Sequence, residues 1–210
     1  MDSVASGLGP KINDRHAESA PVVRVPLNDF ALVSRALDIG AEAIIAPMIN
    51  SPADALRFAS AAKYPPLGER SWGPLRAMAL QSPRTAPVDY MREANDGTLA
   101  FAMVETATAL ACVDTIASTP GIDGLFVGPY DLATALSGGS AQDVQAAQVE
   151  QAIDTICAAA KKADKIPGIY CRDAESAVAI AKRGYRFVIA GNDQTTLRSA
   201  TVAQLKALKS

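Results

Sequence analysis

Two short apolar segments, each leading to a carboxylate, constrain this chain more than any other feature. Leu99–Val104 precedes Glu105, and Gly124–Val127 leads through Gly128-Pro129-Tyr130 to Asp131. The carboxylates are 26 residues apart (131 minus 105), which leaves room for one helix and two short loops. That is the length of a β-α-β unit, so the segments are expected to be neighbouring parallel strands. Both carboxylates then lie at the carboxyl-terminal edge of the sheet, where α/β proteins carry out their chemistry.

A pair of carboxylates at adjacent strand ends suits a hard divalent cation. Mg²⁺ and Mn²⁺ prefer oxygen ligands and keep several waters that a substrate can displace. The alternative is a capping role, in which Glu105 caps the following helix and Asp131 is the N-cap of its own. The two roles are compatible, because a carboxylate can both cap and ligate. The pairing favours a metal site at Glu105 and Asp131.

Six strand-like segments alternate with helical ones, which predicts an α/β fold with a parallel sheet. The strands are expected at 21–25, 43–47, 99–104, 123–127, 167–170 and 186–190. No GxGxxG follows a strand and no GxxxxGK[ST] occurs, so dinucleotide and P-loop folds are excluded. Polar residues recur at the strand ends (Arg24, Glu105, Asp131, Cys171, Asn192 and Asp193), and this distribution favours an incomplete TIM-type barrel of about six β/α units.

The regular pattern occupies residues 21–210, and the polar stretch 1–20 is expected to be an irregular leader. Helices are expected at 29–38, 144–163 and 174–182, with a last one ending near 208. Residues 64–76, rich in Pro and Gly, are expected to form a long functional loop. His16, the only histidine, is expected to be solvated.

The composition of the chain limits the classes of partner and the cellular locations that are expected for it. A net charge of −2 and the absence of a Lys/Arg cluster argue against nucleic acid and an anionic membrane surface. No apolar run reaches the length of a membrane span, and a signal-peptide pattern is missing. Three cysteines without CxxC spacing indicate reduced thiols and a cytoplasmic location. Cys171, at the end of a strand, is a candidate for facing the site.

Several motifs in one order resemble the HpcH/HpaI aldolase family of the pyruvate/phosphoenolpyruvate TIM-barrel superfamily, across about residues 20–200. They are Pro21-Val-Val-Arg24-Val-Pro, Leu37-Asp-Ile-Gly40-Ala, Pro47-Met48, Tyr64-Pro-Pro-Leu-Gly-Glu-Arg70-Ser-Trp72-Gly-Pro, Met103-Val-Glu105-Thr106 and Val127-Gly-Pro-Tyr-Asp131-Leu. The resemblance implies a metal-dependent aldolase that joins or cleaves 4-hydroxy-2-oxo acids to or from pyruvate and an aldehyde. It also implies homo-oligomers, as dimers or hexamers built from dimers, with terminal helices exchanged between neighbours.

The resemblance assigns roles to particular residues. Glu105 and Asp131 would hold Mg²⁺ or Mn²⁺, with Co²⁺ as a further candidate, and Arg24 would hold the pyruvate carboxylate and oxyanion. Gly128, Pro129 and Tyr130 would offer backbone contacts to the carboxylate. In the loop matching Gly68–Gly73, Arg70 and Trp72 are candidate substrate contacts; the alternatives are a solvated cation and loop packing. A structural ion pair is the alternative for Arg24.

The sequence departs from the family at its start. Members carry two further β/α units before the strand that matches 21–25, and the second of these supplies a histidine general base. Residues 1–20 are too few for two such units, each of roughly 25–30 residues, and His16 is not expected to replace that base. Two other functions therefore stay open: a non-catalytic or partner-dependent paralog that binds metal and oxo acid, and a citrate-lyase-type enzyme that cleaves CoA esters.

Overall fold

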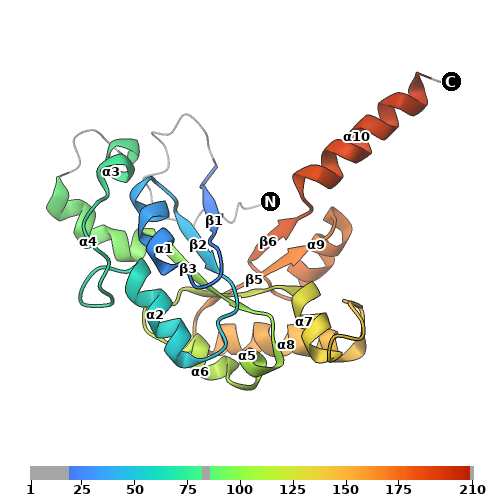
Figure 1. Cartoon of the computed structure of the whole chain (residues 1–210), viewed down its shortest axis with the longest axis horizontal. Helices are drawn as coiled ribbons and strands as arrows, with labels where there is room; N and C mark the ends of the chain where they lie inside the picture. The colour runs from blue at the N-terminus through green and yellow to red at the C-terminus, as the bar shows by residue number, and fades with distance from the viewer. Residues whose placement is uncertain (1–18, 82–85, 209–210) are drawn as a thin grey trace.

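The computed structural model describes residues 19–81 and 86–208, and its centre is one curled sheet of six parallel strands (Figure 1). The strands follow sequence order, β1-β2-β3-β4-β5-β6, so each pairs with its neighbour in the chain. Their bounds are β1 Val22–Arg24, β2 Ala43–Ala46, β3 Leu99–Val104, β4 Gly124–Val127, β5 Ile166–Cys171 and β6 Phe187–Ala190. The expected six-unit incomplete barrel is confirmed, with each strand end within a residue or two of its prediction.

Helices cover the outer face of the curled sheet. Their bounds are α1 Phe30–Asp38, α2 Pro52–Ala62, α3 Leu75–Gln81, α4 Pro87–Gly97, α5 Ala107–Ala111, α6 Val113–Ala117, α7 Pro129–Leu136, α8 Ala147–Lys162, α9 Ala174–Lys182 and α10 Asp193–Ala207. Among the described residues, no helix combines the length and apolar character needed to cross a bilayer. Helix α10 projects away from the rest of the chain, and none of its residues is buried (Figure 1).

One expectation for the region between β2 and β3 needs correction, and one helix there was not expected. The expected loop 64–76 ends earlier, because α3 begins at Leu75, and the unexpected helix is α4, which precedes β3. The sequence of α4 shows little of the apolar periodicity that indicates a helix, because only Tyr90 and Ala94 are buried. Pro87 occupies its first turn, a common position for proline. The expected leader lies outside the described residues up to residue 18, as does His16.

Alternation along the strands sorts their side chains between two layers. Val104, Val127 and Ile169 join the large cluster between sheet and helices. Met103 and Phe126 belong instead to the inner cluster of the barrel, against which Tyr170 packs. Successive residues of a strand point to opposite faces, so the residues just beyond Met103 and Phe126 can be assigned to a face by counting.

A buried lysine joins the amino-terminal edge of the sheet to the end of α2. Lys63 is 1% exposed, and its Nζ lies 2.7 Å from Asp123 Oδ2, just before β4. The same ammonium donates to the carbonyl oxygens of Asn95 and Thr98, which precede β3. The loop that follows Lys63 therefore starts at the amino-terminal edge, opposite the edge that carries the ends of β3 and β4.

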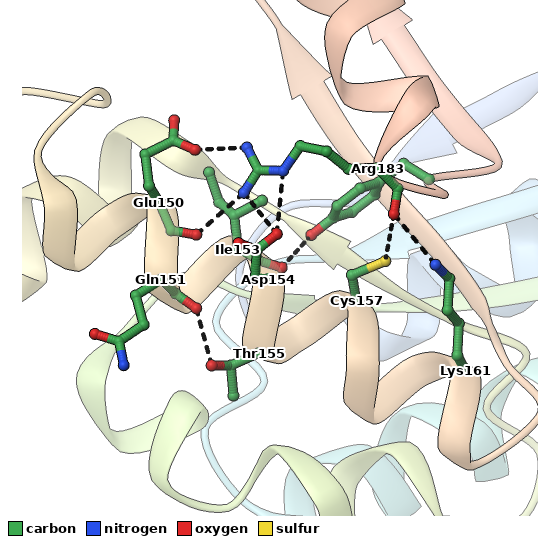
Figure 2. A network of polar contacts seen from close by, with 9 residues as sticks. Glu150, Gln151, Ile153, Asp154, Thr155, Cys157, Lys161 and Arg183 are labelled. Atoms are coloured by element: carbon green, nitrogen blue, oxygen red, sulfur yellow. Dashed lines mark hydrogen bonds and ion pairs between the residues drawn. The ribbon is translucent and has the colours of Figure 1, made fainter.

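The last β/α unit is fixed to α8 by the polar network in Figure 2. The Arg183 guanidinium pairs with Glu150 at 2.5 Å and with Asp154 at 2.8 Å, and the Lys161 ammonium donates to the Arg183 carbonyl. Tyr185, just before β6, donates its hydroxyl to the carbonyl oxygen of Ile153 at 2.8 Å. These contacts fix the start of β6, and with it the last β/α unit, relative to α8.

Candidate functional site

Glu105 forms the buried floor of the site. It follows β3 directly, is 1% exposed, and its Oε1 accepts the Met48 N–H at 2.8 Å. Met48 donates from a left-handed backbone conformation (φ 54°) in the turn after β2, which aims its N–H at the carboxylate. Glu105 Oε2 is buried and has no hydrogen-bond partner in the described part of the chain. A buried carboxylate oxygen without a donor is a position that a cation would satisfy.

Gly128, directly after β4, leaves the space that this carboxylate occupies. A Cβ at Gly128 would stand 2.4 Å from Glu105 Oε2 and 2.7 Å from Met103 Cε. The carboxylate therefore lies over the Gly128 backbone, with Met103 below it. Any other side chain at this position would displace one of the two.

Asp131 approaches the Glu105 carboxylate from the first turn of α7. This helix begins at Pro129 with Gly128 as its N-cap, and Asp131 is its third residue. Thr106 is the N-cap of the helix after β3, where its hydroxyl accepts the Ala109 N–H at 3.0 Å. The N-cap alternative for the two carboxylates is therefore wrong: Gly128 and Thr106 occupy the N-cap positions.

The charges of the three candidate residues act on one another. Burial raises the pKa of the Glu105 carboxyl, and the nearby Asp131 carboxylate raises it further. The Met48 N–H and the Arg24 guanidinium lower the pKa of the same group. Arg24 is the last residue of β1, three strands along the sheet from β4. The curled sheet thus brings Arg24, Glu105 and Asp131 within electrostatic reach of one another.

The donor set fits a hard cation that shares its coordination sphere with solvent or substrate. Within residues 19–81 and 86–208, no three His, Cys, Asp or Glu side chains gather closely enough to form a metal site by themselves. Two carboxylates with an unsatisfied buried oxygen match the one or two carboxylates with which proteins commonly hold Mg²⁺. Such a site leaves several coordination positions for water or an oxo acid.

Arg70 and Trp72 do not join this cluster within one chain. The Arg70 side chain is buried, pairs with Asp38 at 2.6 Å, and lies over the Tyr64 ring at 4.6 Å. Trp72 is 43% exposed and packs on the rings of Tyr64 and Tyr90, with centroids 5.9 Å and 6.1 Å away. Both belong to the loop that leaves Lys63 at the amino-terminal edge. The alternative considered for Trp72, packing within the loop, agrees with these ring contacts, and the solvated state considered for Arg70 is wrong.

Cys171 does not face the site, contrary to expectation, because β5 extends one residue further than predicted and includes it. The strand runs to Cys171, whose thiol packs in the outer cluster beneath the helices. Tyr170 therefore points to the inside of the barrel in its place. Its ring lies 6.2 Å from that of Tyr130, the neighbour of Asp131. Sequence reasoning missed Tyr170, although counting by two from an inward residue of β5 would have found it.

A six-stranded piece of a parallel barrel with two acids and an arginine at its carboxyl-terminal edge defines a barrel-type α/β enzyme. The model of the family described as HpcH/HpaI aldolase/citrate lyase matches residues 5–200. The chain belongs to this family. The names of its relatives place it among the aldehyde-lyases.

Two curated relatives and one solved structure illustrate the similarity. A hydroxypyruvate/pyruvate aldolase of Rhizorhabdus wittichii is 38% identical over 90% of this chain and 74% of its own length. A 4-hydroxy-2-oxo-heptane-1,7-dioate aldolase of Salmonella paratyphi B is 34% identical over 85% of this chain and 66% of its own. The crystal structure of an HpcH/HpaI aldolase/citrate lyase family protein from Burkholderia cenocepacia superposes with a TM-score of 0.81, at 37% identity over 93% of this chain and 76% of that one. The chain thus spans about two thirds to three quarters of these relatives.

Proposed function

We propose that the protein is a divalent-metal-dependent aldolase that cleaves 4-hydroxy-2-oxo acids to pyruvate and an aldehyde, or forms them. The observation that supports this most strongly is the buried Oε2 of Glu105, which has no hydrogen-bond partner among the described residues and lies beside Asp131 and within electrostatic reach of Arg24. Mg²⁺ or Mn²⁺ would be held by the two carboxylates, and when bound it supplies Lewis acidity at the 2-oxo group. Co²⁺ would fit the same oxygen donors.

The other groups of the site match the rest of an oxo acid. Arg24 offers a planar, two-pronged donor to a carboxylate, which a lysine would not reproduce. In the first turn of α7, the N–H groups of Tyr130 and Asp131 have no partners inside the helix, and Pro129 has no N–H. The positive end of this helix suits the same carboxylate. The site would therefore bind the oxo acid by its carboxylate and hold its 2-oxo group near Glu105.

A cleavage assay tests the proposal. With Mn²⁺, the protein is expected to release pyruvate from 4-hydroxy-2-oxopentanoate, and excess EDTA is expected to stop the release until Mn²⁺ is restored. The physical reason is that negative charge develops on pyruvate as the carbon–carbon bond breaks and requires a positive group held in place. Turnover that is unchanged in EDTA would contradict the metal dependence. Turnover of CoA esters without turnover of the hydroxy-oxo acid would favour a citrate-lyase type instead.

We propose further that the working protein is a homo-oligomer. Helix α10 buries none of its residues and exposes Leu197 and Leu205, and its C-cap residue Leu208 is exposed as well. This arrangement is expected of a helix that packs on a second copy. Arg70 and Trp72, at the amino-terminal edge, could contact substrate only if a second copy presents this edge to the mouth of the first. Their proposed substrate contacts therefore depend on the oligomer.

Mixing two inactive variants tests this shared site. Glu105→Gln removes a metal ligand in its own chain, and Trp72→Ala removes a contact expected to be offered to the neighbour. After mixing and subunit exchange, about a quarter of wild-type activity is expected, because half of randomly assorted dimers are mixed and each keeps one complete site. A mixture that stays as inactive as its parents would contradict the shared site.

The proposed location is the cytoplasm. Cys112, Cys157 and Cys171 are all free thiols, as expected in a reducing compartment.

A further inference from the structure

Tyr170 stands level with the catalytic carboxylate on the inner wall of the barrel. The register pairs Val104 with Val127, and Val127 with Ile169. Continuing it by one residue places Glu105, Gly128 and Tyr170 in one row across β3, β4 and β5. Neighbouring strands are about 4.8 Å apart, so roughly 10 Å separate the backbones of Glu105 and Tyr170.

Within this row no side chain separates the two, because its middle residue is glycine. The Glu105 carboxylate already leans over Gly128, as the 2.4 Å approach of a Cβ there demonstrates. The next inward-facing row, Met103, Phe126 and Gly168, is apolar and lies beneath Glu105 inside the barrel. A small molecule held at Glu105 and Asp131 would thus have the Tyr170 phenol on its other side.

The phenol is held in place by contacts from two elements. Asn192 Nδ2 donates to the Tyr170 oxygen at 3.2 Å, while Asn192 Oδ1 accepts the Thr195 N–H at 2.8 Å as the N-cap of α10. The Tyr130 ring packs against the Tyr170 ring from α7. Because Tyr170 accepts from Asn192, its own O–H proton is directed elsewhere and is available to a ligand.

We propose that Tyr170, positioned by Asn192, donates a hydrogen bond to the C4 oxygen of the substrate, the atom that becomes the aldehyde oxygen. This inference rests on the proposed aldolase function. In cleavage, the C4 hydroxyl loses its proton to water, the C3–C4 bond breaks with its electron pair left on C3, and C3 then takes up a proton. Negative charge develops on the C4 oxygen as its proton leaves, and the Tyr170 O–H stabilises that charge.

The test compares two reactions of one variant, Tyr170→Phe. Cleavage of 4-hydroxy-2-oxopentanoate with Mn²⁺ is expected to fall about 100-fold in kcat, the usual effect of removing one such donor. The calorimetric affinities for Mn²⁺ and for pyruvate are expected to stay unchanged, since neither contact involves the C4 oxygen. Exchange of the pyruvate methyl protons in deuterated water, which needs no aldehyde, is also expected to stay at the wild-type rate.

Two further variants separate positioning from folding. Asn192→Asp keeps an N-cap acceptor for Thr195 but loses the donor to Tyr170, so kcat for cleavage is expected to fall while α10 stays helical by circular dichroism. Tyr185→Phe removes the hydroxyl that binds Ile153 outside the barrel. It is expected to lower Tm without changing kcat.

Three results would overturn the inference, and they are distinguishable. Wild-type kcat for cleavage in Tyr170→Phe, from an active wild-type enzyme, would contradict the role of Tyr170 alone. A wild-type protein that neither cleaves the hydroxy-oxo acid nor binds pyruvate with Mn²⁺ would contradict the proposed function and this inference with it. Loss of pyruvate affinity in Tyr170→Phe would also contradict the inference, because the phenol would then act on the pyruvate half.

Discussion

Glu105→Gln is expected to have two opposite effects, depending on whether metal is present. The variant should lose at least about 100-fold in Mn²⁺ affinity, because even residues that only support a ligand commonly contribute 10–100-fold. In EDTA at neutral pH the same variant should be more stable than the wild type. It replaces a buried carboxylate, whose Oε2 has no partner in the described chain, by a neutral amide that still accepts from Met48.

The pH dependence of this gain follows from the direction of the pKa shift. Burial raises the pKa of Glu105 above its ordinary value of 4.5. Between that value and the raised pKa, the native state therefore binds more protons than the unfolded state. Wild-type stability in EDTA therefore falls as pH rises through this window. The advantage of Glu105→Gln should be absent below about pH 4.5 and should grow above it. Thermal unfolding across pH, with and without Mn²⁺, measures both effects; equal stability at all pH values would contradict the buried charge.

Gly128→Ala is expected to disrupt the site without changing any charge. The new Cβ would stand 2.4 Å from Glu105 Oε2 and 2.7 Å from Met103 Cε, so the carboxylate must move. Overpacking of this kind costs about 1–3 kcal/mol of unfolding free energy. Displacing the carboxylate is expected to weaken Mn²⁺ binding to an extent comparable with Glu105→Gln. Calorimetry and urea unfolding measure the two effects.

Gly97→Ala is the matched control for this substitution. It adds the same methyl group in α4, where a Cβ would meet no atom within 4 Å. Because alanine loses less backbone entropy than glycine on folding, stability should rise by about 0.5–1 kcal/mol with metal affinity unchanged. Equal loss of metal affinity in both variants would show that the Gly128 effect is not local.

The fold could be predicted from the sequence because each strand is indicated by residues that are close together in the chain. Strands such as Leu99–Val104 are continuous apolar runs between helix-length segments, which parallel sheets require. The carboxylates were found for the same reason, since each follows such a strand closely. The helix α4 was missed because its polar face outweighs two buried residues, Tyr90 and Ala94.

The rest of the site depends on tertiary features that spacing along the chain does not encode. Arg70 resembled a substrate ligand from its motif, but the exit of α2 at the amino-terminal edge directs it to Asp38. The inward direction of Tyr170 required the end of β5 and the register with β4, and one residue of error exchanges it with Cys171. The Met48 contact to Glu105 joins residues 57 apart and depends on a left-handed turn.

The most direct test of the central claim is calorimetric titration of the protein with Mn²⁺ and then with pyruvate, beside the Glu105→Gln/Asp131→Asn double variant. The account predicts that the wild type binds Mn²⁺, that pyruvate binds only when Mn²⁺ is present, and that the double variant binds neither while its circular dichroism spectrum stays that of the wild type. Pyruvate binding that persists in EDTA or in the double variant would contradict a metal site at Glu105 and Asp131. A folded wild type that binds neither ligand would contradict the proposed function as well.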